Sequence, residues 1–284
     1  MSDRGRMLVS CPDRPGIIAA ISTFLFEQGA NIVHSDQHST DPLGGQFFLR
    51  VEFELAGLAA RAADLRRSFA AIANRYALDW RLIVADQAKR IAVLASREDH
   101  CLIELLWQRR AGDLHADIAF VIGNHEETAE VVAPWGVPFH YIPVTPGGKS
   151  DAEARQLALI EGDVDLIVLA RYMQILSPHF VERWQNRIIN IHHSFLPAFA
   201  GARPYAQAYQ RGVKLIGATA HYVTHELDAG PILEQDVHRV DHRDTADDLR
   251  RIGRQIERAV LARAVIWHVE DRVLVHGNKT MVFS

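Results

Sequence analysis

Three short apolar runs restrict what this chain can fold into more strongly than any other feature. The runs "IAVLAS" (91–96), "DIAFVIGN" (117–124) and "DLIVLA" (165–170) contain almost no polar residues. Strands that are buried on both faces have this composition, whereas strands with one face in water alternate apolar and polar residues. Apolar residues at helical spacing lie between the runs, at about 102–108 and 152–161. The order predicts an α/β domain with a mostly parallel sheet and right-handed crossovers.

Further strands are expected downstream of these runs. The segments "IINIHH" (188–193), "KLIGATAHYV" (214–223) and "PILEQDVHRV" (231–240) have strand patterns, and a long helix is predicted from about Thr245 to Trp267. After this helix, "RVLVHGNKTMVF" (272–283) predicts a terminal hairpin.

The first 85 or so residues follow a different pattern. A strand, a helix that ends at Gly29, and two paired strands joined by the loop "DPLGG" (41–45) are predicted in that order. A second helix, from about Leu58 to Tyr76, and a strand in "LDWRLIV" (78–84) complete the series. This β-α-β-β-α-β order is the ferredoxin-like arrangement. One face of the third strand carries the apolar residues Phe47, Leu49, Val51, Phe53 and Leu55.

The two patterns meet at a short polar segment, "ADQAKR" (85–90). We therefore expect two domains, 1–85 and 91–284, with a linker at 86–90. A length of 284 residues suits two domains of ordinary size.

Composition excludes several classes of protein. The net charge of −4 provides no basic stripe of the kind that nucleic-acid binding requires. The two cysteines, Cys11 and Cys101, lie far apart and form no metal or redox spacing. The N-terminus has no secretory signal pattern, and no apolar run approaches the roughly 18 residues that span a membrane. We expect a cytoplasmic protein without nucleic-acid or membrane partners.

The stretch "NIHHSFLPAFAG" (190–201) places polar side chains where an apolar strand ends. Asn190 and His192 are separated by one residue, so their side chains point to the same side of the strand. An amide and an imidazole in this position can hydrogen-bond a carbonyl oxygen that gains negative charge. Ligands of α/β sheets bind at such strand ends. A polar strand end with satisfied histidines is the alternative interpretation.

A carboxylate for proton transfer is available in "HELDAGPI" (225–232). Asp228 lies in a predicted loop just before the next strand, and Glu226 is two residues away, so a pair of carboxylates is conceivable. The alternative interpretation is that Asp228 only shapes the turn Asp-Ala-Gly-Pro.

Two other patterns are less specific. The segment "ARYMQILSP" (170–178) mixes a cation, an aromatic side chain and apolar side chains after a buried strand, and could line a pocket for a flat ligand. Ser177-Pro178 is also typical of a helix start. His221 and His225 could join His192 and His193 in a metal cluster, but no zincin-like spacing supports this, and we expect no metal.

Together, the motifs Asn190-Ile-His192, Ser194-Phe-Leu-Pro197 and Leu227-Asp228-Ala-Gly230-Pro231 resemble the catalytic domain of the folate-dependent formyltransferases, over about 90–284. The resemblance implies a Rossmann-like sheet of the formyltransferase fold. It implies that Asn190, His192 and Asp228 are the catalytic residues, and it places the pterin of a folate near 170–176 and near the loop before Asp228. The substrate-binding residues implied are Arg171, Met173, Ile175, Leu176 and His193.

The N-terminal motifs "CPDRPGIIAAIS" (11–22) and "GANI" (29–32) resemble an ACT domain, a ferredoxin-like regulatory module. An ACT domain fused to this catalytic domain resembles the deformylase branch of the family, as does His193 where amine formyltransferases often carry Pro or Ala. The resemblance implies hydrolysis of 10-formyltetrahydrofolate to formate and tetrahydrofolate, which supplies formate to purine biosynthesis and balances one-carbon folate pools. It implies that no cofactor is needed, since the folate is the substrate, and that the chain forms a homo-oligomer, a dimer or a tetramer.

Water as the acceptor is also indicated by the residues after the first strand of the second domain. Enzymes that hold a nucleotide phosphate use a glycine-rich turn at a helix N-terminus, where free N–H groups and the helix dipole attract the anion. This chain has no glycine between Val93 and Leu102, and Glu98 and Asp99 add negative charge there. The site is poorly built for a phosphate.

Three alternatives to hydrolysis stay open at this point. A formyltransferase would pass the formyl group to an amine and would depend on added amine. A catalytically silent amino-acid sensor would keep the ACT domain alone in use, although Asn190, His192 and Asp228 are all present. A metal hydrolase would be inactivated by chelators.

The ACT resemblance also implies an effector site. The turn Asp13-Arg14-Pro15-Gly16 leads into a helix N-terminus, whose free N–H groups suit the carboxylate of an amino acid. Asn31, which opens the next strand, could bind the amino group. The effector implied is a small amino acid such as glycine or methionine. The alternative is that Pro15 and Gly16 only shape the turn.

Overall fold

The computed structural model describes residues 3–41, 44–85, 88–197 and 204–283. The chain divides into two compact units. The first contains the chain up to Ala88, together with Asp271–His276 and the residues from Met281 onward, and the second contains Lys89–Glu270 and Gly277–Thr280. The expected domain ranges had placed all of 271–284 in the second domain. Residues 86–87 of the expected linker lie outside the described residues, and Lys89 already belongs to a strand.

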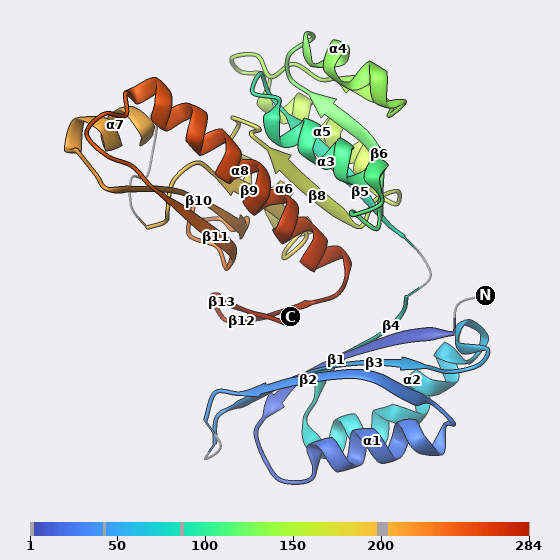
Figure 1. Ribbon diagram of the computed structural model, residues 1–284. Coiled ribbons are helices and arrows are strands. Elements are labelled where there is room, and N and C mark those ends of the chain that lie inside the picture. The colour runs from blue at the N-terminus through green and yellow to red at the C-terminus, as the bar shows by residue number, and fades with distance from the viewer. Residues whose placement is uncertain (1–2, 42–43, 86–87, 198–203, 284) are drawn as a thin grey trace. The chain divides into compact units, whose positions relative to one another are not determined.

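The first unit has the expected ferredoxin-like architecture. Its elements are β1 (Arg4–Pro12), α1 (Ile17–Glu27), β2 (Asn31–Ser39), β3 (Gln46–Glu54), α2 (Leu58–Tyr76) and β4 (Asp79–Val84). The strands form an antiparallel sheet in the order β2-β3-β1-β4. Both helices cover the same face of this sheet (Figure 1).

Both faces of β3 are buried, although its sequence alternates. The apolar residues expected on one face all join the core beneath the helices, as Phe47, Leu49, Val51, Phe53 and Leu55. On the other face, Phe48 is fully buried and its ring centroid lies 5.5 Å from that of His276. Arg50 donates through Nε to the carbonyl oxygen of Asp271 at 3.0 Å. Residues 271–276 therefore cover the sheet face that carries no helix.

The second unit has the expected α/β architecture. Its elements are β5 (Lys89–Ala95), α3 (His100–Ala111), β6 (Ala116–Gly123), α4 (Thr128–Val132), the 3-10 helix η1 (Ala133–Trp135), β7 (Phe139–Tyr141), α5 (Lys149–Ile160), β8 (Leu166–Ala170), α6 (Pro178–Arg183), β9 (Ile188–His192), α7 (Pro204–Arg211), β10 (Leu215–Tyr222), β11 (Ile232–Arg239) and α8 (Ala246–Val269). The hairpin of β12 (Val273–His276) and β13 (Lys279–Val282), expected from the sequence, follows α8.

The large sheet is mostly parallel, in the order β11-β10-β9-β8-β5-β6-β7. Strands β9, β8, β5, β6 and β7 pair in parallel, while β10 is antiparallel to both of its neighbours. The chain runs outward from β5 to β6 and β7 and then returns to β8 on the other side of β5. The carboxyl ends of β5 and β8 therefore flank the crevice at which open α/β sheets bind their ligands.

Helices cover both faces of the large sheet, which explains the apolar runs that mark its strands. Ala92, Leu94, Ile167 and Leu169 pack on one face against residues of α5 and α6, such as Phe180. On the opposite face, α8 contacts β9, β10, β11 and α3 (Figure 1). No described helix combines the length and the apolar character that crossing a membrane requires.

Candidate active site

Asn190 and His192 lie at the carboxyl end of β9, and the antiparallel neighbour β10 brings a polar partner to each. Asn190 is opposite His221 in the register, and His192 is opposite Thr219. The Nδ2 atom of Asn190 lies 3.2 Å from Nε2 of His221. The sequence placed Asn190 and His192 on one side of a strand, and the structure adds His221 to the same set.

Asp228 is brought to this set by a tight loop between β10 and β11. A Cβ atom at Gly230 would lie 1.8 Å from the carbonyl oxygen of Tyr222, so only glycine allows the loop to approach β10 this closely. The Asp228 backbone has φ of 57°. Its carboxylate lies 3.2 Å from Nδ1 of His192 and 3.7 Å from Nε2 of His221.

The hydrogen bonds of His221 assign the protons around Asn190. Nδ1 of His221 lies 3.0 Å from the carbonyl oxygen of Tyr222, which can only accept, so Nδ1 carries a hydrogen. In the neutral ring Nε2 then accepts from the Asn190 amide. The second amide hydrogen of Asn190 is left for a ligand. Nε2 of His192 is buried and has no hydrogen-bond partner among the described residues.

Two pKa shifts follow from this geometry. The hydrogen bond from His192, and then the nearby ring of His221, hold the pKa of Asp228 well below its usual range, so this carboxylate is ionised. Burial, followed by the charge of Arg171, lowers the pKa of His193 to about 4. His193 is therefore a neutral imidazole at physiological pH.

All the residues expected for catalysis and substrate binding line one pocket of about 310 Å³. They are Asn190, His192, Asp228, Arg171, Met173, Ile175, Leu176 and His193. Met173, Ile175 and Leu227 expose more than half of their side chains there, at 57%, 63% and 61%. Exposed apolar side chains beside a few convergent polar groups are typical of a site for a flat organic ligand.

Arg171 links the segment after β8 to the wall of this pocket. Its φ of 59° is uncommon for a side chain without a short local hydrogen-bonding group. Its Nε atom lies 3.4 Å from the Glu257 carboxylate. Farther along the segment, Ser177 accepts a hydrogen bond from the Phe180 amide and caps α6, with Pro178 at the first turn. The helix-start interpretation of Ser177-Pro178 is thus correct, and residues 171–176 line the pocket as well.

Thr219 fixes the residues that follow β9. Its hydroxyl donates to the carbonyl oxygen of Ser194 at 2.9 Å and accepts from the amide of Leu196 at 3.0 Å. Thr219 is fully buried. Residues 198–201 of the quoted stretch lie outside the described residues.

Sequence reasoning considered His221 only as part of a metal cluster and did not single out Thr219. A signal was present, because both lie at alternate positions of an otherwise apolar strand, like Asn190 and His192. His225 does not join the set, since its side chain is 58% exposed and pairs with Glu182 at 3.8 Å. Within the described residues, the group whose ligand atoms lie close enough for a metal ion is instead His100, Cys101 and Glu257.

The expected effector residues of the first unit lie in two places. Asp13, Arg14 and Gly16 line a pocket of about 620 Å³ at the N-terminus of α1, a helix without a side-chain cap. Gly16 has φ of 93°, so this position requires glycine. The Arg14 guanidinium stacks on the Tyr76 ring at 4.6 Å from its centroid.

Asn31 lies at the opposite end of the sheet from this turn. It pairs with Glu54 at the start of β2, whereas the turn follows Pro12, which pairs with Gln46. Eight residues of strand separate Asn31 from Ser39, the residue that hydrogen-bonds Asp13, a distance of roughly 26 Å. Within one chain, Asn31 and the turn cannot contact the same small ligand.

Comparison with known proteins decides the family. Residues 6–68 match the family model described as ACT domain, and residues 89–265 match the one described as formyl transferase. A protein of Bacillus subtilis (strain 168) named formyltetrahydrofolate deformylase is 59% identical over 283 residues, which cover 99% of this chain and 94% of that protein. The chain belongs to the formyltetrahydrofolate deformylase family.

Solved structures agree with this membership. The crystal structure of a formyltetrahydrofolate deformylase from Pseudomonas syringae pv. tomato has a TM-score of 0.94 and 48% identity, and the match covers 99% of this chain and 94% of that one. Glycinamide ribonucleotide transformylase 1 from Symbiobacterium toebii has a TM-score of 0.65 and 31% identity, and covers 69% of this chain and 95% of its own. The family thus shares a catalytic fold with formyl-transferring enzymes.

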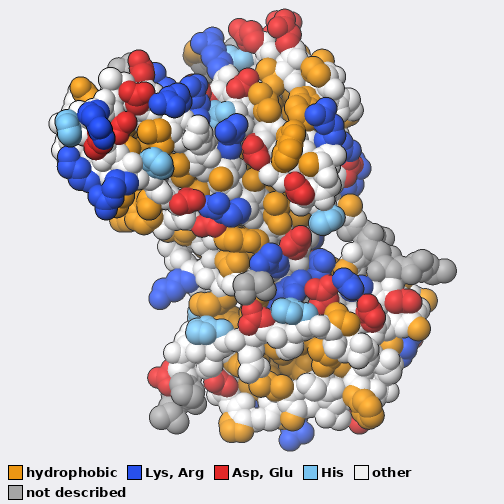
Figure 2. Space-filling model, in the orientation of Figure 1, with side chains coloured by type: hydrophobic (Ala, Val, Ile, Leu, Met, Phe, Trp, Pro, Cys, Tyr) orange, Lys and Arg blue, Asp and Glu red, His pale blue; other side chains and the backbone are white. Residues whose placement is uncertain are grey.

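The surface carries mixed charge. On the face that Figure 2 shows, basic and acidic side chains alternate and do not gather into a basic stripe. This distribution agrees with the net charge of −4 and offers no extended anion-binding track.

Proposed function

We propose that the protein hydrolyses 10-formyltetrahydrofolate to formate and tetrahydrofolate, with Asn190, His192 and Asp228 as its catalytic residues. The observation that carries this proposal is their convergence on one pocket in a chain of the formyltetrahydrofolate deformylase family. The apolar rim formed by Met173, Ile175 and Leu227 is the expected platform for the pterin ring.

The reaction forms one bond and breaks one. The oxygen of water adds to the formyl carbon, and the formyl oxygen becomes an oxyanion. The second Nδ2 hydrogen of Asn190 and the ring of His192, which Asp228 holds through Nδ1, stabilise this charge. The carbon–N10 bond then breaks, one proton of the water ends on N10, and formate leaves while the second proton is released to solvent.

The lowered pKa of Asp228 sharpens the role expected for this residue. A carboxylate that stays ionised is a weak base, so it holds the proton of water only transiently on the way to N10. Its lasting effect is to orient the attacking water and to keep Nδ1 of His192 protonated. We also propose that neither a cofactor nor a metal takes part, since the formyl group is already an activated electrophile.

Transfer to an amine is the second candidate, because the transformylase of S. toebii shares the catalytic fold. The segment between β5 and α3 disfavours it, since this segment has no glycine and carries the negative charges of Glu98 and Asp99. A silent sensor is disfavoured by the intact geometry around Asp228.

The test is release of formate in water alone. Purified protein incubated with 10-formyltetrahydrofolate and no amine should produce formate and tetrahydrofolate in equal amounts. Asp228→Asn is the matched variant, because it keeps the shape of the side chain and removes its charge. We expect formate release to fall by about 10²–10⁴ while the fold is kept. A variant that retains a tenth of the rate would remove Asp228 from the mechanism, and a native protein that needs an amine would replace hydrolysis by transfer.

We propose further that the first unit binds a small amino acid, such as glycine or methionine, in a homo-oligomer. The uncapped N-terminus of α1 faces the pocket lined by Asp13, Arg14 and Gly16, and suits a carboxylate. The distance of Asn31 from this turn means that a ligand using both would lie between two chains. Calorimetry of the intact protein with each of the twenty amino acids tests this, and the absence of binding at millimolar concentration would leave the unit as an assembly surface. Chromatographic mass measurement tests the dimer or tetramer.

The cellular role proposed with this activity is supply of formate for purine biosynthesis and balance of one-carbon folate pools, in the cytoplasm. A strain that lacks the gene should then require added formate, glycine or purine under conditions in which tetrahydrofolate is trapped in its formyl form.

A further inference from the structure

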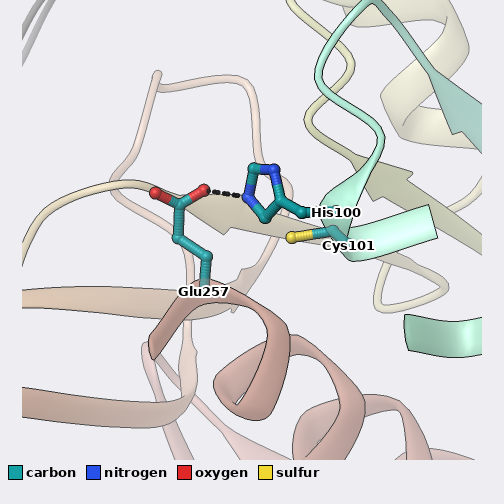
Figure 3. Close-up of side chains that lie close together, drawn as sticks. All are labelled: His100, Cys101 and Glu257. Carbon is teal, nitrogen blue, oxygen red and sulfur yellow. Dashed lines mark hydrogen bonds and ion pairs between the residues drawn. The ribbon is translucent and has the colours of Figure 1, made fainter. Parts of the chain in front are cut away.

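A cluster of polar side chains lies buried beside the catalytic pocket, and the mechanism above does not use it. Its centre is Glu257 of α8, which is 1% exposed. His100, the first residue of α3, and Tyr205 of α7 reach it from two other elements, and Arg171 reaches it from the end of β8. Figure 3 shows His100 pointing at the Glu257 carboxylate, with Cys101 beside it. We call these residues the Glu257 cluster.

The Glu257 carboxylate has no free oxygen. The Tyr205 hydroxyl donates to Oε1 at 2.5 Å, Nε2 of His100 lies 2.8 Å from Oε2, and Nε of Arg171 lies 3.4 Å from the same oxygen. Burial alone would raise the pKa of Glu257, but these neighbours outweigh it and lower the pKa. Burial and the nearby Glu257 charge raise the pKa of Tyr205, which stays a neutral donor. The Glu257 carboxylate is thus ionised and fully paired, whereas Nδ1 of His100 and the Nε and Nη1 atoms of Arg171 are buried without a hydrogen-bond partner among the described residues.

Helix α8 has a glycine, Gly253, at the point where Tyr205 packs against it. A Cβ atom at Gly253 would lie 2.1 Å from the Tyr205 hydroxyl oxygen. Glycine in a helix interior is less favourable than alanine, so Gly253 lowers the stability of α8 but leaves room for the Tyr205 side chain. Gly253 lies one turn before Glu257 on the same face of the helix. Gly253 thus leaves space for the Tyr205 ring, and Glu257, one turn later in α8, accepts the hydrogen bond from its hydroxyl.

The cluster lies at the ligand crevice of the sheet. The carboxyl ends of β5 and β8 flank this crevice, and His100 and Arg171 follow these two strands. The open pocket is formed instead by segments after β8, β9 and β10. Arg171 and His193 stand between the two regions, since both line the pocket and the His193 ring centroid is 6.1 Å from that of Tyr205.

We infer that the Glu257 cluster determines the acceptor of the formyl group by closing the side from which an amine substrate would approach, so that only water reaches the formyl carbon. This inference rests on the proposed hydrolysis. In transfer, the amine nitrogen would bond to the formyl carbon, the carbon–N10 bond would break, and a proton of the amine would pass to N10. The fold itself does not forbid this, because it is shared with a transformylase.

A metal site is the competing interpretation of the same side chains. His100, Cys101 and Glu257 offer a nitrogen, a sulfur and an oxygen within 4.8 Å of one another. A metal would meet the guanidinium of Arg171, which already lies 3.4 Å from a Glu257 oxygen. This fixed positive charge opposes a divalent cation.

The experiment opens the crevice and offers an amine. Tyr205→Ala and His100→Ala each remove a side chain that closes it, and Tyr205→Phe is the matched control, which keeps the ring and loses only the hydroxyl. Each protein is incubated with 10-formyltetrahydrofolate carrying a ¹³C-formyl group and with excess glycinamide, and formate and N-formylglycinamide are measured separately. We expect the native protein and Tyr205→Phe to give formate alone, and at least one opened variant to give N-formylglycinamide about tenfold above the native background.

The inference is overturned if folded Tyr205→Ala and His100→Ala proteins both release formate and neither forms N-formylglycinamide above the native background. It is also overturned if elemental analysis finds one zinc per chain in the native protein, because the cluster would then be a metal site. A native protein that releases no formate from 10-formyltetrahydrofolate contradicts the proposed function, and this result is distinct from a failure of the opened variants alone.

Discussion

Asp228 and Arg171 both have backbone conformations that residues other than glycine seldom adopt, with φ of 57° and 59°. Such conformations cost about 1–3 kcal/mol and persist only where the surroundings hold them. For Asp228 these surroundings are His192 and His221, and for Arg171 they are Glu257. Both residues face the pocket, so local backbone strain and the proposed chemistry coincide.

Asn190 and His192, which we propose to stabilise the same oxyanion, should act as one unit. Asn190→Ala and His192→Ala should each lower kcat by about 10²–10³, because each removes a donor to the same developing charge. The double variant should lose much less than the product of the two single losses. Steady-state kinetics of the four proteins measures this. His225→Ala serves as control, since His225 lines the same pocket but is exposed and pairs with Glu182. Fully multiplicative losses would show that the two residues act on different atoms.

His193 should make the protein less stable as the pH falls below about 6.5. Its pKa is about 4 in the folded chain and about 6.5 when unfolded, so the unfolded chain binds the extra proton first. The stability from the neutral ring is complete above the unfolded pKa and is lost between about pH 6.5 and 4. Urea unfolding of the native protein and of His193→Gln at pH 7.5, 6 and 5 measures it.

The pH dependence of the stability that Asp228 contributes follows from the same argument. Its folded pKa lies below the unfolded one, so its contribution is complete above the unfolded pKa and is lost only at lower pH. The loss between pH 6.5 and 5 therefore belongs to His193, and it should be smaller in His193→Gln. An equal loss in both proteins would assign the acid sensitivity to other groups.

At the scale of elements, the loop between β10 and β11 is the part of the site that we expect to tolerate substitution least. Gly230→Ala would place Cβ 1.8 Å from the Tyr222 carbonyl oxygen, so the loop must move and Asp228 with it. We expect activity to fall by about 10²-fold, as for a misplacement on the order of 1 Å. Gly136→Ala is the control, because a Cβ atom at Gly136 meets open space, so this substitution strains the backbone at a positive φ without any close contact. Assays and melting curves of both variants measure the difference, and equal activities would show that the close approach is not required.

The order of strands and helices could be predicted because the apolar residues of each long element recur at the spacing of a strand or of a helix. The β-α-β-β-α-β series, the helix Leu58–Tyr76 and the buried parallel strands are all present as expected. The short elements β7, α4 and α7 were not predicted, since three to eight residues hold too little of either period. Burial on both faces of β3 was not predicted either, because its cover is residues 271–276, far away in sequence.

The site was predictable only where its residues share a motif. Asn190, His192 and Asp228 were found by pattern and resemblance, and they meet in space. His221 joins them through the register between β9 and β10, which no local pattern specifies. The Glu257 cluster needs α3, α7 and α8 to converge, so it requires tertiary structure. Asn31 is the opposite case: it lies close in sequence to the turn at Asp13–Gly16 but far from it in space.

For the whole molecule, the first unit is built from two distant parts of the chain. Asp271 joins it through Arg6, with 3.2 Å between Nη1 and Oδ2, and through the Arg50 bond to its carbonyl oxygen. Asp271 is 5% exposed. A fair test of regulation by the first unit must therefore treat 271–276 as part of that unit, because removing 1–85 alone leaves the segment that packs there without its sheet.

A chain that ends at Glu270 should lose structure in the first unit. Phe48 would be exposed and Nε of Arg50 would lose the Asp271 carbonyl oxygen as its acceptor, so the sheet should open more readily. Hydrogen exchange should show faster amide exchange in β1 and β3, while β8 and β9 serve as the internal control. Unchanged protection of β3 would mean that the C-terminal segment does not stabilise the sheet.

The two-part construction of the first unit also sets an order of events on the ribosome. Strand β3 is synthesised early, but the residues that cover its second face follow roughly 200 positions later, which corresponds to on the order of 10 to 40 seconds of translation. During that interval Phe48 and the apolar atoms around it are open to solvent, and the nascent sheet is a substrate for chaperones that bind apolar surface. Slowing translation between codons 55 and 270 should therefore raise the fraction of newly made chain that aggregates or is degraded, even though no residue of the finished protein differs.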